Sequence, residues 1–177
     1  MRKEIRYCGA GGQGVILLGI VTAHAAVIEG NYSSQGAVYG AQVRGGIAAS
    51  EVVLSTEPVI FPYIEQSDML LSLSQEAFDY YLAGAKRGSI IIIDSGLITV
   101  DDNVREKFKV YEKPFTRLSI KNFKTHTLAN MIAFGFVAHF LKEFISERSA
   151  LEAIERSVSK KFQKLDKEAF RLGLSLH

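Results

Sequence analysis

The sequence has little cysteine, little proline and no tryptophan: one Cys, three Pro and no Trp among 177 residues. A single cysteine excludes an internal disulfide, and with no Cys-x-x-Cys motif we expect neither an iron–sulfur nor a zinc site in this chain. The charge is also nearly balanced, with 21 basic and 19 acidic residues and a formal net charge of +2. This small excess gives no reason to expect nucleic acid or an anionic membrane as a partner.

Long apolar runs are missing as well. The longest charge-free apolar segment late in the chain, LANMIAFGFVAHFL, is too short to span a bilayer and contains Asn130 and His139. The first residues, MRKEIRYC, carry positive charge but no apolar run of signal-peptide length. We therefore expect a cytoplasmic, soluble protein that forms one domain over residues 1–177.

Strand-like segments alternate with helical segments along the chain. The expected strands are 4–8, 31–34, 47–55, 69–74 and 89–94, with an edge strand at 107–111. The expected helices are 14–28, 75–86, 126–145, 147–161 and 166–172. This alternation predicts an α/β fold, a Rossmann-like three-layer α/β/α sandwich with a mostly parallel sheet. Ligands of such sheets bind at the carboxyl ends of the strands.

The segment CGAGGQG follows the first expected strand and leads into a helix. Gly9, Gly11 and Gly14 have the spacing G-x-G-x-x-G. Glycine lets backbone N–H groups approach an anion, and a helix N-terminus adds partial positive charge. A phosphate or pyrophosphate would then meet the N–H groups of Gly11, Gly12, Gln13 and Gly14.

A complete dinucleotide site also needs an acid after the second strand to bind the ribose hydroxyls. The nearest acid is Glu29, which precedes that strand, and the far end of the strand offers Ser33, Ser34 and Gln35. The motif is therefore incomplete for NAD or FAD. A different phosphate-bearing ligand, or a purely structural strand–helix turn, remains open.

A second glycine-rich segment, QGAVYGAQVRGG at residues 35–46, has no clear period and is interpreted as a functional loop. Arg44 would place a forked, permanently charged donor beside open backbone, which suits a phosphate, a carboxylate or a partner subunit. A solvated arginine on a surface loop is the alternative. Tyr39 could stack on a base or simply pack. The candidate binding residues here are Tyr39, Gly40, Arg44, Gly45 and Gly46.

Other side chains with chemical potential have simpler interpretations. Cys8 is expected to be a small buried residue, His24 a core histidine, and Asp94 a turn or helix-capping acid. A buried Asn130 would need hydrogen-bond partners, either structural or in a site. We find no nucleophile–base pair and no metal-ligand spacing, so we expect no catalytic or metal-binding residue in this chain. Such a domain suggests a subunit of a larger assembly.

Eight segments occur in one order that resembles a known family, the gamma subunits of 2-oxoacid:ferredoxin oxidoreductases. They are GAGGQGVILLG, YGAQVRGG, SEVVLS, VIFPYIEQSD, LSLSQEAFDYYL, IIIIDSGLI, THTLANMIAFG and LDKEAFRLG. The resemblance covers nearly the whole chain and extends to the pyruvate/ketoisovalerate gamma subunits. The residues of these segments are most similar to those of the 2-oxoglutarate branch.

The resemblance implies an enzyme that oxidatively decarboxylates a 2-oxoacid, forms the acyl-coenzyme A and reduces ferredoxin. It also implies alpha and beta subunits that hold thiamine diphosphate between them, with iron–sulfur clusters in beta or in a ferredoxin-like delta subunit. For this chain it implies a role in assembly and in binding coenzyme A through the first two glycine motifs, whereas the role of Asn130 in the third motif stays open. The alternatives are an assembly subunit without a ligand and a stand-alone nucleotide-binding oxidoreductase. The isolated chain could form a homodimer.

Overall fold

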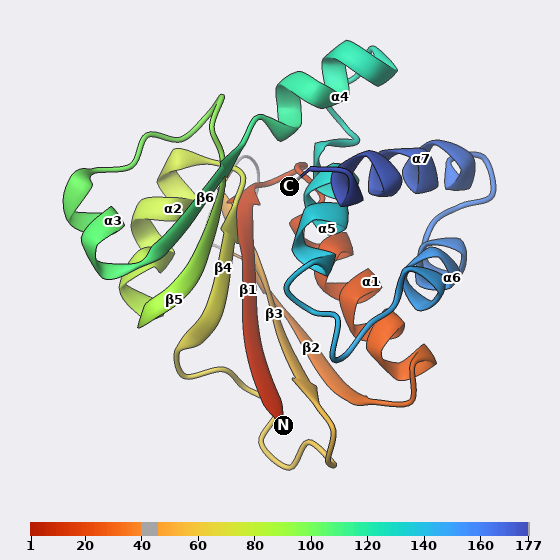
Figure 1. Cartoon of the computed structure of the whole chain (residues 1–177), viewed down its shortest axis with the longest axis horizontal. Coiled ribbons are helices and arrows are strands. Elements are labelled where there is room, and N and C mark those ends of the chain that lie inside the picture. Colours follow the sequence, from red (N-terminus) through yellow and green to blue (C-terminus); the bar gives the residue numbers. More distant parts are fainter. Residues whose placement is uncertain (40–45, 177) are drawn as a thin grey trace.

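The computed structural model describes residues 1–39 and 46–176, and its centre is one mixed sheet of six strands (Figure 1). The spatial order is β2-β3-β1-β4-β5-β6. The strands are β1 (Arg2–Ala10), β2 (Tyr32–Tyr39), β3 (Ile47–Ser55), β4 (Ser67–Ser72), β5 (Ala85–Asp94) and β6 (Lys109–Lys113). Strand β3 is antiparallel to both of its neighbours, while β1, β4, β5 and β6 pair in parallel. The predicted α/β class with a mostly parallel sheet is confirmed.

Helices cover both faces of this sheet, so the predicted three layers are present. The helices are α1 (Val15–Ile28), α2 (Gln75–Tyr81), α3 (Asp102–Lys107), α4 (Phe115–Phe123), α5 (Ala129–Ala138), α6 (Glu147–Ser157) and α7 (Gln163–Leu174), with a 3-10 turn, η1, at Leu82–Gly84. Helices α1, α5, α6 and α7 lie on one side, and α2 and α3 on the other (Figure 1). None of the helices in the described part of the chain has the length and apolarity that a membrane crossing requires.

The two layers of helices explain the unbroken isoleucine run in β5. Ile92 belongs to the core on the α1 side, whereas Ile91 and Ile93 belong to the core on the α2 side, and all three are fully buried. Successive side chains of a strand point to opposite faces, so a strand covered on both faces is apolar throughout.

The structure corrects the predicted boundaries around the second strand. Strand β2 extends to Tyr39, so the first part of the segment interpreted as a loop is strand. The polar residues fit a strand because neighbouring elements satisfy their side chains. Ser33 Oγ donates to the Ala23 carbonyl (3.0 Å) and Gln35 Nε2 donates to Ser50 Oγ (2.8 Å). They lie within β2 and not at its far end.

The helical half of the chain also differs from the prediction. Helix α5 ends at Ala138, far short of the predicted residue 145, and α3 and α4 were not predicted. After α5 the chain turns, and side chains from elsewhere satisfy its carbonyls. Lys3 Nζ donates to Phe140 O (3.0 Å) and Asn31 Nδ2 donates to Phe144 O (2.9 Å). Helical periodicity does not predict such partners, because they are distant in the sequence.

Helices α5 and α7 touch backbone to backbone at two glycines. A Cβ placed on Gly135 would lie 2.0 Å from the Phe170 carbonyl oxygen, and one on Gly173 would lie 2.0 Å from the Ile132 carbonyl oxygen. Both contacts are with backbone, which cannot rotate away. The glycines that end THTLANMIAFG and LDKEAFRLG therefore belong to one helix crossing.

We predict that Gly173→Ala lowers the free energy of unfolding by about 3 kcal/mol or more, because the added methyl group forces α7 away from α5. Chemical denaturation measures this change. Gly36→Ala is the control, since a Cβ there has nothing within 4 Å, and we expect a change within about 1 kcal/mol. Equal stability of the two variants would contradict the close helix contact.

Candidate functional site

The glycine loop after β1 lies at a topological switch point, where neighbouring strands continue into helices on opposite faces of the sheet. Strands β1 and β4 are parallel neighbours, and Leu73 N donates to Cys8 O (2.9 Å) just where β4 ends. From β1 the chain enters α1 on one face of the sheet, and from β4 it enters α2 on the other face (Figure 1). In open α/β sheets this arrangement leaves a crevice between the strand ends, which is where ligands bind.

The Gln13 side chain fixes the loop across this crevice. Its Oε1 accepts a hydrogen bond from Ala10 N (2.7 Å) and its Nε2 donates to Leu73 O (2.7 Å). Gly9 leaves the room for this side chain, since a Cβ at Gly9 would lie 2.6 Å from Gln13 Oε1. Gln13 is therefore the residue that connects the end of β1 with the end of β4.

Gly46, the last residue of the second glycine motif, lies directly beside the first motif. Gly11 N donates to Gly46 O (3.0 Å), and the adjoining Ala10 pairs with Ile47 in the β1–β3 ladder. Tyr39 ends β2 opposite Ala48. The remaining predicted members, Gly40, Arg44 and Gly45, lie outside the described residues.

Asn130, from the third motif, packs on the same loop. Its Nδ2 lies 3.4 Å from Gly14 O, and its Oδ1 accepts a hydrogen bond from Met131 N (2.8 Å). Gly14 has a φ of 74°, and a Cβ there would lie 2.2 Å from Asn130 Nδ2. Asn130 thus has a structural role in holding the start of α1, and its position explains why residue 14 is glycine.

These contacts leave some loop donors free. Gly11 N is bonded to Gly46 O, and Gln13 N to Ala10 O (3.1 Å). The N–H groups of Gly12 and Gly14 make no hydrogen bond to any residue that the structure describes. Helix α1 has neither a side-chain cap nor an acidic residue in its first turn. The partial positive charge of its N-terminus is therefore not compensated within the described chain.

A cavity of about 200 Å³ opens beside Gly12 and Gln13. Its other lining residues are Leu73, Leu97, Thr116, His126, Thr127 and Ala129. Gly12 has a φ of 94°, and a Cβ there would have nothing within 4 Å, so space remains over its backbone. Helix α5 also begins at this cavity and has no side-chain cap. The cavity lining is mostly apolar, with Thr116, His126 and Thr127 as polar side chains, and the uncapped start of α1 beside it favours an anionic ligand there.

Sequence reasoning missed most of this lining. Thr116 comes from a stretch with no predicted element, and His126 and Thr127 come from the first turn of the predicted helix at 126–145. The available signal was that THT immediately precedes the apolar Asn130 helix, because hydroxyl and imidazole groups at a helix start can face a strand-end site. Leu73 and Leu97 carry no sequence signal beyond following β4 and β5.

The carboxylates of Asp94 and Glu29 are hydrogen-bonded within the protein. Asp94 is fully buried, and its carboxylate accepts hydrogen bonds from Gly96 N (3.0 Å) and Thr116 N (2.7 Å). This confirms the predicted turn and helix-capping role. Glu29 Oε2 accepts from Ser146 Oγ (2.6 Å), which lowers the pKa of Glu29. Glu29 lies at the amino end of β2, away from the glycine loop, so it cannot serve a ribose there.

The prediction of burial is confirmed for Cys8 and wrong for His24. Cys8 is fully buried, and burial raises the pKa of its thiol to about 12, which confirms the prediction of an inert packed residue. His24 was predicted to lie in the core, but it is exposed and its Nδ1 is 2.9 Å from Ser157 Oγ of α6. That prediction was wrong because α1 is apolar almost all round, so periodicity did not show which side faces solvent.

Comparison with known proteins gives consistent matches over the whole chain. Residues 4–176 match the family described as pyruvate ferredoxin/flavodoxin oxidoreductase. The chain is similar to the 2-oxoglutarate synthase subunit KorC of Methanocaldococcus jannaschii, with 37% identity covering 98% of this chain and 92% of that protein. It is also similar to the KorC subunit of Methanothermobacter thermautotrophicus, with 35% identity covering 99% and 95%.

Solved structures share the fold. The gamma subunit of the keto/oxoacid ferredoxin oxidoreductase from Geobacter sulfurreducens superposes with a TM-score of 0.80 at 33% identity, covering 97% of this chain and 95% of that chain. The 2-oxoglutarate:ferredoxin oxidoreductase from Magnetococcus marinus, with 2-oxoglutarate, coenzyme A and succinyl-CoA bound, gives a TM-score of 0.88 at 24% identity. That match covers 99% of this chain and 31% of that longer chain, and it shows a shared fold.

We predict that Gln13→Glu lowers the free energy of unfolding by about 2 kcal/mol at pH 7, because a carboxylate replaces the donor to Leu73 O with a second acceptor. Urea denaturation measures the change. Gln66→Glu adds the same charge at an exposed residue with no hydrogen bond to the described chain, and should be nearly neutral. A Gln13→Glu variant as stable as Gln66→Glu would contradict the bridging role.

Proposed function

Since the chain belongs to the pyruvate ferredoxin/flavodoxin oxidoreductase family, we propose that it is the gamma subunit of a 2-oxoacid:ferredoxin oxidoreductase. The proposed 2-oxoacid is 2-oxoglutarate, because the KorC relatives are named subunits of 2-oxoglutarate synthase and align along nearly their whole length. The complete enzyme forms an acyl-coenzyme A and passes electrons to ferredoxin. This chain contributes to assembly and to the binding of coenzyme A.

The observation that carries the coenzyme A proposal is the open backbone at Gly12. A phosphate beside Gly12 can accept hydrogen bonds from the free N–H groups of the loop and lie at the uncapped N-terminus of α1. Thr116, His126 and Thr127 line the same cavity and offer further polar groups. The residues present therefore fit an anionic group, with Gly12 as the point of closest backbone approach.

The cavity size limits which part of the ligand this chain can hold. Sites that enclose a drug-sized ligand measure roughly 300–1,000 Å³, whereas this cavity measures about 200 Å³. It suits a phosphate or pyrophosphate group and leaves the thiol end of coenzyme A to other subunits. Coenzyme A supplies the thiol that takes up the acyl group, and the residues of this chain position its charged end.

The second glycine motif would complete this anion site. Gly46 is joined to Gly11 by a hydrogen bond, so the segment that carries Arg44 begins beside the loop. We propose that the Arg44 guanidinium makes a charge-assisted, bidentate contact with a coenzyme A phosphate. Tyr39, Gly40 and Gly45 belong to the same proposed binding segment.

The redox chemistry is assigned to partner subunits. One buried cysteine cannot provide the thiolates that an iron–sulfur cluster needs. The described residues also contain no group of three or more His, Cys, Asp and Glu side chains placed to hold a metal ion. We propose that alpha and beta subunits hold thiamine diphosphate, that beta or delta carries the clusters, and that the complex works in the cytoplasm.

A pair of glycine variants tests the binding proposal. Gly12 and Gly30 have nearly the same backbone, with φ values of 94° and 92°, and a Cβ at either has nothing within 4 Å. Alanine therefore adds the same strain at both positions, but only Gly12 faces the cavity. In the reconstituted enzyme we expect Gly12→Ala to raise the KM for coenzyme A about tenfold or more, as expected for a weakened charge-assisted hydrogen bond. The KM for 2-oxoglutarate should not change.

Gly30→Ala should leave the KM for coenzyme A at the wild-type value. If Gly12→Ala also leaves it unchanged, the loop does not bind coenzyme A and the chain is an assembly subunit without a ligand. If the isolated chain binds NAD or FAD in calorimetry, the alternative of a stand-alone oxidoreductase gains support. We expect no such binding, because the ribose acid is missing.

A further inference from the structure

We propose that the end of the sheet opposite the glycine loop is a docking surface for another protein subunit, one that inserts an acidic segment and offers an apolar hollow. The proposal rests on the proposed function in that the partner is a subunit of the same enzyme. The surface, called the amino-end surface below, comprises the β3–β4 loop at residues 58–63 and the adjoining basic cavity. Both lie near the N-terminus, at the lower end of the sheet in Figure 1.

The β3–β4 loop exposes large apolar side chains. Ile60 is 95% exposed, Phe61 50% and Tyr63 66%. Three such side chains within four residues form an exposed apolar cluster, and scattered single residues would be unremarkable. Aromatic and aliphatic anchors of this kind supply much of the binding energy when a partner covers them.

The loop is held in place although its side chains are exposed. Arg2 donates from one guanidinium nitrogen to Phe61 O (3.0 Å) and Tyr63 O (3.1 Å), and Ser34 Oγ donates to Pro62 O (2.9 Å). The Phe61 and Tyr63 rings meet edge to face at 5.6 Å. A loop fixed by its carbonyls loses little further conformational entropy when a partner binds. Its apolar side chains are therefore already arranged for contact.

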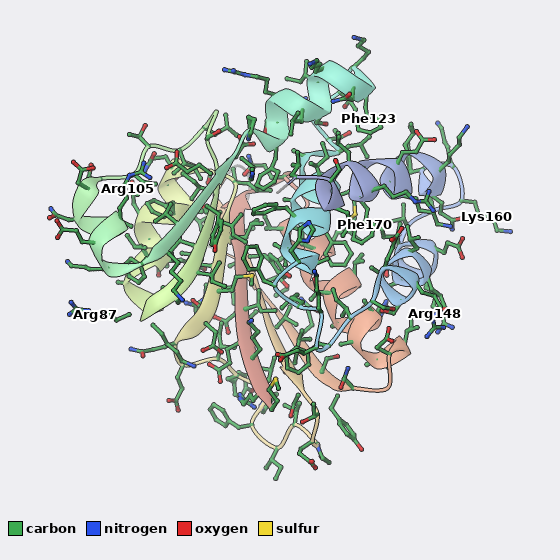
Figure 2. All side chains as sticks on the ribbon, viewed as in Figure 1. Arg87, Arg105, Phe123, Arg148, Lys160 and Phe170 are labelled. Atoms are coloured by element: carbon green, nitrogen blue, oxygen red, sulfur yellow. The ribbon has the colours of Figure 1, made fainter. Side chains whose placement is uncertain are left out.

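A basic cavity of about 410 Å³ adjoins this loop. Its charged lining residues are Arg2, Lys3, Lys86, Arg87, Lys109, Asp68 and Glu143. Lys86 is paired with Asp68 (2.7 Å), but Arg87 and Lys109 are exposed, and their side chains have no ion pair or hydrogen bond with any described residue. Figure 2 shows Arg87 extending away from the start of β5. The cavity therefore offers uncompensated positive charge.

Arg2 joins the two parts into one surface, because it lines the basic cavity and also holds the β3–β4 loop. A second copy of this chain fits poorly, since a two-fold contact would place the same positive surfaces against each other. A flat anionic membrane would not fill a hollow of this size. A protruding acidic segment of a protein matches both the shape and the charge.

The test uses two double variants of the amino-end surface in the enzyme co-expressed with its alpha and beta subunits. Ile60→Ser/Phe61→Ser removes the apolar anchors, and Arg87→Glu/Lys109→Glu reverses the free charges. The controls are Leu165→Ser, at a leucine of α7 that is 42% exposed, and Lys160→Glu/Lys164→Glu, at two exposed lysines. Lys160 lies far from Arg87 (Figure 2). Affinity for the partner subunits is measured by surface plasmon resonance, with thermal melting of each isolated chain as the folding check.

We expect both amino-end variants to bind the partner subunits at least tenfold more weakly while melting like wild type, and both controls to bind normally. The loss for the charge variant should shrink at high salt. If the wild-type chain does not bind alpha or beta subunits at all, the proposed function itself fails. If wild type and both variants bind equally, only the docking surface is overturned.

Two other occupants would also overturn the assignment. One is a homodimer of the isolated chain in light scattering that Ile60→Ser/Phe61→Ser dissociates while subunit binding stays normal. The other is wild-type binding to phosphatidylserine vesicles that Arg87→Glu/Lys109→Glu abolishes, again with normal subunit binding. In either case the surface would bind something other than a partner subunit.

Discussion

The candidate site depends on the Gln13 side chain, which spans from Ala10 N to Leu73 O across the ends of β1 and β4. A glutamine can do this because its amide is at once an acceptor and a donor. The bridge uses the polar groups of Gln13, and the neighbouring Gly12 lines the cavity with open space over its backbone. Gly9 is glycine because the bridge needs space, and Gly14 because Asn130 lies against it. Gly46 of the second motif is bonded to Gly11, so the described parts of the three sequence motifs pack together.

This packing changes what the glycine motif means. A G-x-G-x-x-G loop suggests four equivalent N–H groups around a phosphate, but the protein itself uses those of Gly11 and Gln13. In the proposed site, the remaining donors and the uncapped start of α1 suit a small anion and not a complete dinucleotide. A partial site of this kind is consistent with a subunit that binds one end of a ligand shared with its partners. The opposite end of the sheet is left for contact with those partners.

Much of the fold was predictable because burial imposes patterns on the sequence. The isoleucine run of β5, the β-branched content of β3 and the long apolar run of α1 predicted these three elements from composition and length. Strand β2 was only half predicted, because the partners of Ser33 and Gln35 lie on α1 and β3. The glycine motifs of the site were found from their spacing. The cavity lining was not, because Leu73, Thr116 and His126 come together only through the order of the strands.

We propose that the Gln13 bridge leaves the Gly12 N–H open to a coenzyme A phosphate. Hydrogen–deuterium exchange on the assembled enzyme, with and without coenzyme A, measures whether this N–H is free and whether the ligand protects it. Gly11 N should exchange slowly in both states because it is bonded to Gly46 O, whereas Gly12 N should exchange rapidly alone and become protected by coenzyme A. Protection of Gly12 without ligand, or exchange at Gly12 unaffected by saturating coenzyme A, would contradict the account.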